Sequence, residues 1–119
     1  MDALRLSRPG PAASVALALV RLADPEPRPD ELVLDVAACA VCRTDLQIIA
    51  GDLEARRRPI VPAHQAVGRV IGVGQDVSGW AVGDRAGVAW LGSACGRCGY
   101  CRGGRANLCP EATFTGWDR

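Results

Sequence analysis

Several short stretches rich in apolar residues predict β-strands, and in one of them apolar and polar residues alternate, a pattern typical of a strand with one better-buried face. Stretches of this kind are residues 14–22, 31–37, 66–73 and 85–91. The second stretch divides its side chains between two faces: Leu32, Leu34 and Val36 on one, Val33 and Asp35 on the other. Short strands of this kind predict a mainly β fold of barrel or sandwich type.

Helix and loop signals fill the segments between these strands. Residues 42–50 mix polar and apolar side chains at near-helical spacing and stop at Gly51, which predicts one short helix. Three prolines in residues 24–30 exclude a strand or helix interior, because each proline removes a backbone donor and fixes φ. We interpret the basic residues 56–58, followed by Pro59, as a solvated turn.

Size and charge narrow the class of protein. The 119 residues suffice for one domain with a modest core, and a formal net charge of +1 gives no electrostatic reason to expect a nucleic-acid or membrane partner. No apolar run approaches the roughly 20 residues that a transmembrane helix needs. Residues 12–20 could belong to a signal peptide, but no convincing cleavage site follows them and we interpret them as a strand. We therefore expect a cytoplasmic protein whose cysteines bind metal.

Four of the six cysteines form a compact motif with the spacing C-x2-C-x2-C-x7-C: Cys95, Cys98, Cys101 and Cys109. Two-residue gaps allow neighbouring thiolates to converge on one ion, and four thiolates leave no open coordination position, so such a site is structural. Zinc suits four soft ligands in a tetrahedron. Two disulfides or an iron–sulfur cluster are the alternatives, since bacterial ferredoxins share the C-x2-C-x2-C spacing.

A second group of candidate ligands, Cys42 and His64, lies earlier in the chain. The alternative for His64 is a histidine with a purely structural role. Residues 39–45 read Cys-Ala-Val-Cys-Arg-Thr-Asp, residues 63–68 read Ala-His-Gln-Ala-Val-Gly, and residues 82–85 read Val-Gly-Asp-Arg ahead of the four-cysteine motif. These four motifs, in this order, resemble the zinc-containing medium-chain alcohol dehydrogenases, and the resemblance covers nearly the whole chain.

The resemblance implies a GroES-like, barrel-type catalytic domain that is partial in this chain. Residues 1–119 would be its N-terminal portion, residues 92–110 its structural zinc lobe, and the Rossmann domain that binds the cofactor would be absent. The glycine-rich residues 68–74 lack G-x-G-x-x-G spacing and lead into a turn, so we reject them as a dinucleotide site. The family's third protein ligand of the catalytic zinc would lie past residue 119, and we expect a truncated chain without activity of its own.

Carried over residue by residue, the resemblance implies that Cys42 and His64 bind the catalytic zinc. Thr44 would take the alcohol proton through its hydroxyl, with a helix cap as its alternative role. Asp45 would accept a hydrogen bond from the ring of His64 and fix its tautomer, with a surface carboxylate as the alternative. Arg43 would face the pyrophosphate of the cofactor, or else be solvated. Zinc and NAD(P) are the implied cofactors.

The implied reaction is hydride transfer from a zinc-bound alcohol to NAD(P), with small alcohols or aldehydes as substrates and a homo-oligomer as a common state of the complete enzymes. A non-catalytic zinc-binding module, or a remnant of such an enzyme, is the alternative. Three residues depart from the family: Ala63 replaces Gly, Gln65 replaces Glu, and Gln47 replaces a proton-relaying histidine. We expect Gln65 to alter ligand exchange at the metal, and Cys39 to be a small buried residue and no ligand.

Overall fold

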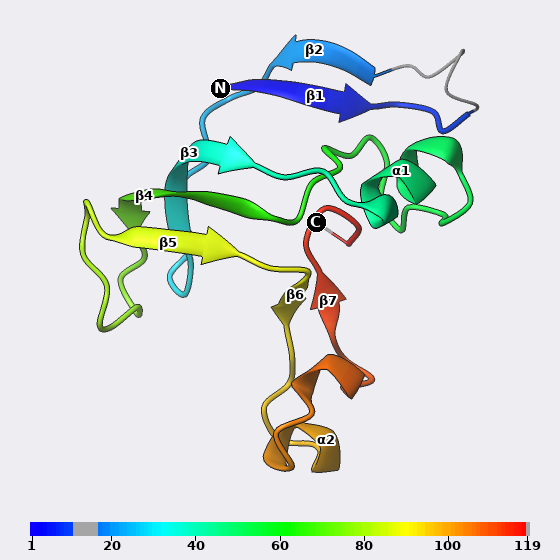
Figure 1. Cartoon of the computed structure of the whole chain (residues 1–119). Coiled ribbons are helices and arrows are strands. Elements are labelled where there is room, and N and C mark those ends of the chain that lie inside the picture. The colour runs from blue at the N-terminus through cyan, green and yellow to red at the C-terminus, as the bar shows by residue number, and fades with distance from the viewer. Residues whose placement is uncertain (11–16, 119) are drawn as a thin grey trace.

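The computed structural model describes residues 1–10 and 17–118, and within them it confirms a mainly β fold. The strands form three small antiparallel sheets, and short helices join them (Figure 1). The strands are β1 (Asp2–Leu6), β2 (Leu17–Arg21), β3 (Leu32–Cys39), β4 (Ala66–Val73), β5 (Arg85–Val88), β6 (Leu91–Ser93) and β7 (Thr113–Phe114). The helices are α1 (Arg43–Ala50), α2 (Gly99–Arg102) and a 3-10 helix (Ala106–Leu108).

Most of the predicted elements lie where the hydrophobic pattern indicates them. β4 matches its predicted range, and α1 matches the predicted helix with Cys42 as its cap. The predicted strand 85–91 is divided between β5 and the first residue of β6. Residues 14–16 of the first predicted strand, and residues 12–16 of the apolar run, lie outside the described residues.

The pattern analysis missed β1, which pairs with β2 in the first sheet. Apolar residues do not mark one buried face of this strand: Ala3 and Leu6 are buried, but Leu4 is 55% exposed. Leu6 is held by two backbone hydrogen bonds with Ile60, of 2.7 and 3.1 Å. The same two side chains pack with Ile48 of α1 in the core cluster. The first sheet thereby packs against α1, the helix that Cys42 caps.

The central sheet has the order β3-β4-β5 and holds the loop before β4 in place. The expected alternation of β3, with one better-buried face, does not continue along the whole strand. A register shift between Val33 and Leu34 breaks the alternation, so that Val33 is 8% exposed and Val36 is 54% exposed. The bulge rotates the strand locally, and the sequence alone gives no signal for it.

A close backbone approach joins β3 to β4 at Gly68. A Cβ atom at this position would lie 2.1 Å from the carbonyl oxygen of Asp35, so the strands would have to separate. We expect Gly68→Ala to lower the free energy of unfolding by about 2 kcal/mol or more, measured by urea unfolding of the zinc-loaded chain. Gly87→Ala, whose Cβ would meet Val67 at an ordinary 3.4 Å, is the matched control on the same sheet. Equal unfolding midpoints for the two variants would contradict this prediction.

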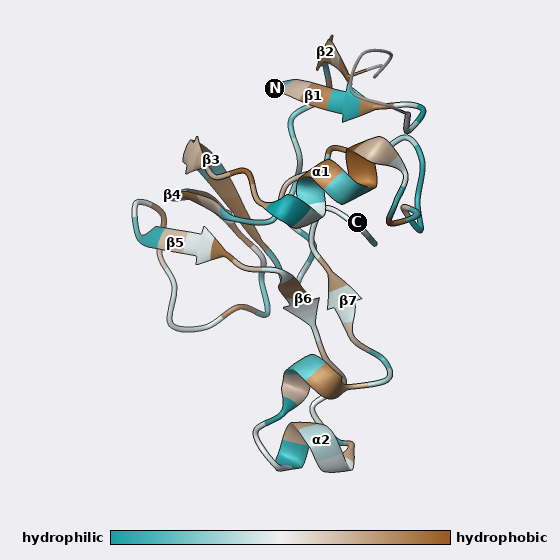
Figure 2. Cartoon of the chain, turned by 45° about the vertical axis from the view of Figure 1, so that its right-hand side comes forward, coloured by the Kyte–Doolittle hydropathy of each residue, from teal (hydrophilic) through white to brown (hydrophobic). Residues whose placement is uncertain are grey.

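Residues 91–114, which include the predicted zinc lobe, extend away from the other two sheets (Figure 1). Strands β6 and β7 form the stem of this segment, and α2 with the 3-10 helix forms its tip. Neither of these two helices has a buried residue, and Figure 2 shows α2 as mostly hydrophilic or neutral. The tip has too little apolar surface to fold around a core, so something other than hydrophobic burial must order it.

None of the helices in residues 1–10 and 17–118 is long and apolar enough to cross a membrane.

Candidate metal centres

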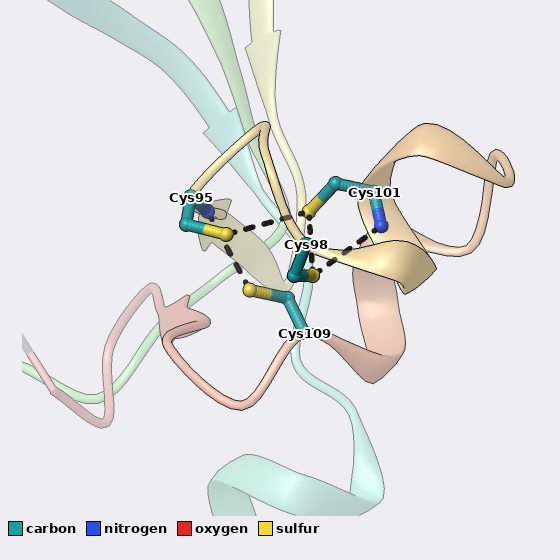
Figure 3. A group of neighbouring side chains, drawn as sticks. All are labelled: Cys95, Cys98, Cys101 and Cys109. Atoms are coloured by element: carbon teal, nitrogen blue, oxygen red, sulfur yellow. Dashed lines mark hydrogen bonds between the residues drawn. The ribbon is translucent and has the colours of Figure 1, made fainter.

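The four cysteines of the predicted motif meet at the tip of the lobe. One sulfur atom from each of Cys95, Cys98, Cys101 and Cys109 lies within 4.8 Å of the others. Figure 3 shows the four sulfurs pointing inward at a common point, with Cys95–Cys101 and Cys98–Cys101 separations of 4.0 and 3.5 Å. Thiolates around one tetrahedral zinc lie about 3.8 Å apart. The arrangement therefore fits a zinc ion, and all six cysteines of the chain are free thiols.

Local backbone structure brings these sulfurs together. Cys98 caps α2, where its sulfur accepts a hydrogen bond from the backbone amide of Cys101 at 3.5 Å. The amide of Cys95 donates to the sulfur of Cys109 at 3.5 Å, which joins the two ends of the motif. The turn after Cys95 is sharp because Gly96 adopts φ 71°, a value that favours glycine. Amide donors around sulfur stabilise thiolates, which are the form that binds a metal.

Hydrogen bonds and burial separate the acidities of two of these thiols. Backbone amides of Arg97 and Cys98 donate to Cys95 and lower its pKa from 9.0 to about 7. Burial raises the pKa of Cys101 to about 12, and the hydrogen bond with Cys98 adds to the shift. At neutral pH, Cys95 is partly thiolate and Cys101 is a thiol, so zinc must displace the proton of Cys101.

In metal-free protein whose lobe keeps this geometry, the difference predicts the order in which the two thiols react. Since only the thiolate attacks iodoacetamide, Cys95 should be alkylated with a pH midpoint of about 7 and Cys101 only under strongly alkaline conditions. Peptide mass spectrometry across a pH series measures both rates in one sample. Faster alkylation of Cys101 than of Cys95 at neutral pH would disagree with the geometry of the lobe.

The second predicted group also comes together, with His64 and Asp45 buried and Cys42 half-buried. The sulfur of Cys42 lies 3.1 Å from Nε2 of His64, and Nδ1 of His64 lies 3.0 Å from a carboxylate oxygen of Asp45. His64 is 4% exposed and Asp45 is 3% exposed. Because the carboxylate accepts the Nδ1 proton, Nε2 keeps its lone pair toward the sulfur. A metal ion would take the place of the thiol proton between these two atoms.

Asp45 holds both of these ligands at once. Its second carboxylate oxygen accepts the backbone amide of Cys42 at 2.9 Å, which closes a capping box at the start of α1. His64 is positioned from the loop that ends at β4, so Asp45 links a helix terminus to a strand terminus. The alternative of a surface carboxylate for Asp45 is wrong, because this side chain is buried.

The structure gives different surroundings to the remaining candidate residues. Thr44 lies within α1, half-buried, and its amide donates to the sulfur of Cys42 at 3.3 Å, so Cys42 and not Thr44 is the cap. Arg43 and Gln65 are exposed, and Gln47 is half-buried in α1. The expectation that Cys39 is buried is wrong: it is exposed at the end of β3.

An aromatic cluster beside His64 escaped the reasoning from sequence. The ring of Trp90 meets the imidazole edge-on, with centroids 4.9 Å apart and an interplanar angle of 70°. Phe114 and Trp117 stack on the same indole at 5.0 and 5.9 Å. The chain has three Trp, one Tyr and one Phe, so most of its few aromatic residues gather here. In the sequence, Trp90 precedes the four-cysteine motif, and Phe114 and Trp117 follow it. This placement is the signal that could have indicated the cluster.

Comparison with known proteins finds a family model that covers both candidate metal centres. The family model described as alcohol dehydrogenase GroES-like domain matches residues 28–117. The "Probable alcohol dehydrogenase AdhA" of Mycobacterium tuberculosis (strain CDC 1551 / Oshkosh) is 47% identical, over 99% of this chain and 36% of the relative. An alcohol dehydrogenase of Geobacillus stearothermophilus is 39% identical, over 86% of this chain and 30% of the relative.

A solved structure has a similar backbone. The cobalt- and zinc-bound thermostable alcohol dehydrogenase from Pyrobaculum aerophilum is 29% identical with a TM-score of 0.88, over 98% of this chain and 35% of that chain. The present chain thus spans about a third of the length of these relatives.

Proposed function

The chain belongs to the alcohol dehydrogenase family through its GroES-like domain, and from this premise we propose that it supplies the zinc-binding part of a zinc-dependent alcohol dehydrogenase. The proposed reaction oxidises a small alcohol, or reduces the corresponding aldehyde, with NAD(P) as the hydride partner. One observation carries the proposal: Cys42 and His64 are in contact, and the buried Asp45 forms hydrogen bonds to both.

The donor atoms of this site suit a catalytic zinc. A thiolate and an imidazole are two members of the Cys2His ligand set used by alcohol dehydrogenases. Ligands of one tetrahedral zinc lie about 3.5 Å apart, close to the 3.1 Å between Cys42 and His64. Zinc held here would act as a Lewis acid toward a bound alcohol and lower its pKa. The third protein ligand and the nucleotide-binding domain would come from outside these 119 residues.

The proposed roles of the surrounding residues follow from their positions. Asp45 keeps the Nδ1 proton on His64 and thereby directs Nε2 toward the metal position. Thr44 is two residues from Cys42 in the first turn of α1, where its hydroxyl would accept and pass on the proton of the alcohol. Arg43 is exposed beside them and would bind the cofactor pyrophosphate with a permanent planar cation. Gln65 is a neutral neighbour of His64 and would leave the charge of the metal less balanced than a carboxylate does.

We propose a structural role for the four-cysteine lobe, residues 92–110. Four thiolates leave no coordination position for a substrate. The tip has no buried residues in its two helices, so bound zinc would order it in place of a core. Free thiols at all six cysteines suit a reducing compartment such as the cytoplasm.

The incomplete ligand set predicts the behaviour of the isolated chain. Loaded with zinc and supplied with NAD⁺ and a small alcohol, these 119 residues should produce no NADH, because the described residues lack a dinucleotide site. Absorbance of NADH over a long incubation measures this directly. Alcohol-dependent NADH formation by the purified chain would show that the chain is complete as a catalyst.

A non-catalytic zinc module is the second candidate. In the described part of the chain, the third potential ligand beside Cys42 and His64 is Asp45, and both oxygens of Asp45 already accept hydrogen bonds. The two candidates differ in how a bound metal responds to alcohol. His64 is the only histidine, so its ring gives one isolated NMR signal. A shift of that signal when alcohol or pyrazole is added to the zinc-loaded chain would favour the dehydrogenase site, and no shift would favour the inert module.

A further inference from the structure

The surroundings of His64 include a second support that the metal chemistry does not use. We propose that Trp90 is a positioning residue for the His64 ring, and that a clamp of Arg56 on Trp117 holds Trp90 in place. The inference rests on the proposed function only in treating His64 as a metal ligand. Its geometry consists of contacts between side chains far apart in the sequence.

The first support of His64 leaves one motion open. The hydrogen bond from Nδ1 to Asp45 fixes the direction of the imidazole, but the ring can still rock about that bond. Trp90 meets the imidazole edge-on with centroids 4.9 Å apart, an arrangement in which the two rings attract each other. A large, flat neighbour in that position limits the rocking and keeps Nε2 directed at Cys42.

Trp90 is in turn held within a stack of aromatic rings. Phe114 lies nearly parallel to it, at 5.0 Å and 26°, and Trp117 lies at 5.9 Å and 21°. Phe114 and Trp117 also contact each other at 5.7 Å. Rings with only two side-chain torsions lose little entropy when they are ordered, so the stack is a rigid packing surface beside the imidazole.

A cation closes the outer side of this stack. The guanidinium carbon of Arg56 lies 4.1 Å from the ring centroid of Trp117, and one of its nitrogens is 3.1 Å from the carboxylate of Asp118. The indole N–H of Trp117 donates to the backbone carbonyl of Glu54 at 2.7 Å. The residues after α1 are thereby tied to the turn that follows β7. The interpretation of residues 56–58 as a solvated turn is therefore incomplete for Arg56.

The same turn also contacts the backbone next to His64. Gly116 has φ 69°, and a Cβ atom there would lie 2.2 Å from the carbonyl oxygen of Ala63. Only a residue without a side chain allows this approach. The turn at 114–118 thus reaches the histidine by two routes, through the backbone of Ala63 and through the ring of Trp90. Both routes end at the ligand, and neither involves the hydrogen bonds of Asp45.

The single histidine makes the proposal measurable in the zinc-loaded chain of 119 residues. NMR of the His64 ring protons reports two quantities: the ring-current shift caused by Trp90, and the midpoint of a titration with additional Zn²⁺ once the four-cysteine lobe is filled. Trp90→Leu should abolish the ring-current shift and raise the zinc midpoint by about tenfold, the range found for partners that orient a metal ligand. Trp90→Phe should retain much of both.

Arg56→Gln tests the clamp without changing the aromatic rings themselves. It should move the His64 signal toward its position in Trp90→Leu and raise the zinc midpoint, and Arg56→Lys should restore both values in part because a cation remains over the indole. Arg57→Gln, the exposed neighbour, is the matched control and should leave both values unchanged. Retention of zinc by the four-cysteine lobe in every variant shows that the lobe is intact, and an unchanged urea midpoint shows that the rest of the fold is.

The results separate this proposal from the proposed function. Unchanged ring-current shifts and zinc midpoints in Trp90→Leu and Arg56→Gln would overturn the positioning role. If instead Zn²⁺ never moves the wild-type His64 signal, then His64 is not a metal ligand and the proposed function fails. In that case the ring-current shifts of the same variants still decide whether Trp90 and Arg56 hold the imidazole.

Discussion

Cys109→Ser should remove tight zinc binding from the lobe and unfold its tip. Cys109 is 6% exposed, and its sulfur accepts the amide of Cys95, so the substitution removes a ligand and loosens the closure of the motif. Zinc binding to small structural sites supplies on the order of 10 kcal/mol of folding free energy. Losing an outer partner of a metal ligand already costs roughly 10–100-fold in affinity, and losing the ligand itself should cost more than that.

Thermal unfolding and competition with a chelator measure this effect. The chelator concentration that removes zinc from the variant should be more than about a hundredfold lower than the concentration needed for the wild type. Cys39→Ser is the matched control, because Cys39 is an exposed thiol outside both groups of candidate ligands. Equal zinc retention by the Cys109 and Cys39 variants would mean that the four sulfurs do not share a metal.

Asp45→Ala should weaken both the second metal site and the fold around it. The change leaves the Nδ1 proton of His64 and the amide of Cys42 without their acceptor in a buried place. An unsatisfied buried donor costs about 1–3 kcal/mol, and the lost helix cap costs about 1 kcal/mol more. We expect the free energy of unfolding to fall by about 3 kcal/mol, and zinc affinity at Cys42 and His64 to fall by roughly 10–100-fold.

Urea unfolding and the His64 titration with Zn²⁺ measure the two parts of this prediction separately. Asp52→Ala, which removes an exposed carboxylate shortly after α1, is the control and should change neither value. Asp45→Asn keeps the shape of the side chain but can offer its oxygen to only one of the two donors, so it should lie between wild type and alanine. If Asp45→Ala left the zinc affinity unchanged, His64 would need no partner to orient it.

The sequence reveals the elements whose signals are local. The helix at 43–50 follows from a mixed pattern at near-helical spacing and from Gly51 at its end, and β4 follows from a run of aliphatic residues. The four-cysteine group is equally local, because its gaps of two residues force the sulfurs together. These features need no knowledge of the rest of the fold.

The remaining features depend on contacts that only the folded chain creates. The bulge in β3 and the pairing of β1 with β2 depend on the register of neighbouring strands. The clamp joins Arg56 to Trp117 and Asp118 across 61 and 62 residues, by the difference of their numbers. No periodic pattern connects such positions, so a basic run reads as a surface turn although Arg56 contacts residues far along the chain.

The dehydrogenase proposal depends on two metal sites that differ in completeness. Zinc per chain, measured by mass spectrometry after an EDTA wash and desalting, tests this most directly. We expect about one zinc per wild-type chain, retained in His64→Ala and lost in Cys109→Ser, because under this proposal the four-thiolate site has all its ligands while Cys42 and His64 are only two of the three protein ligands of the other. No zinc in the wild-type chain, or zinc lost with His64 and retained without Cys109, would contradict the assignment of the two sites.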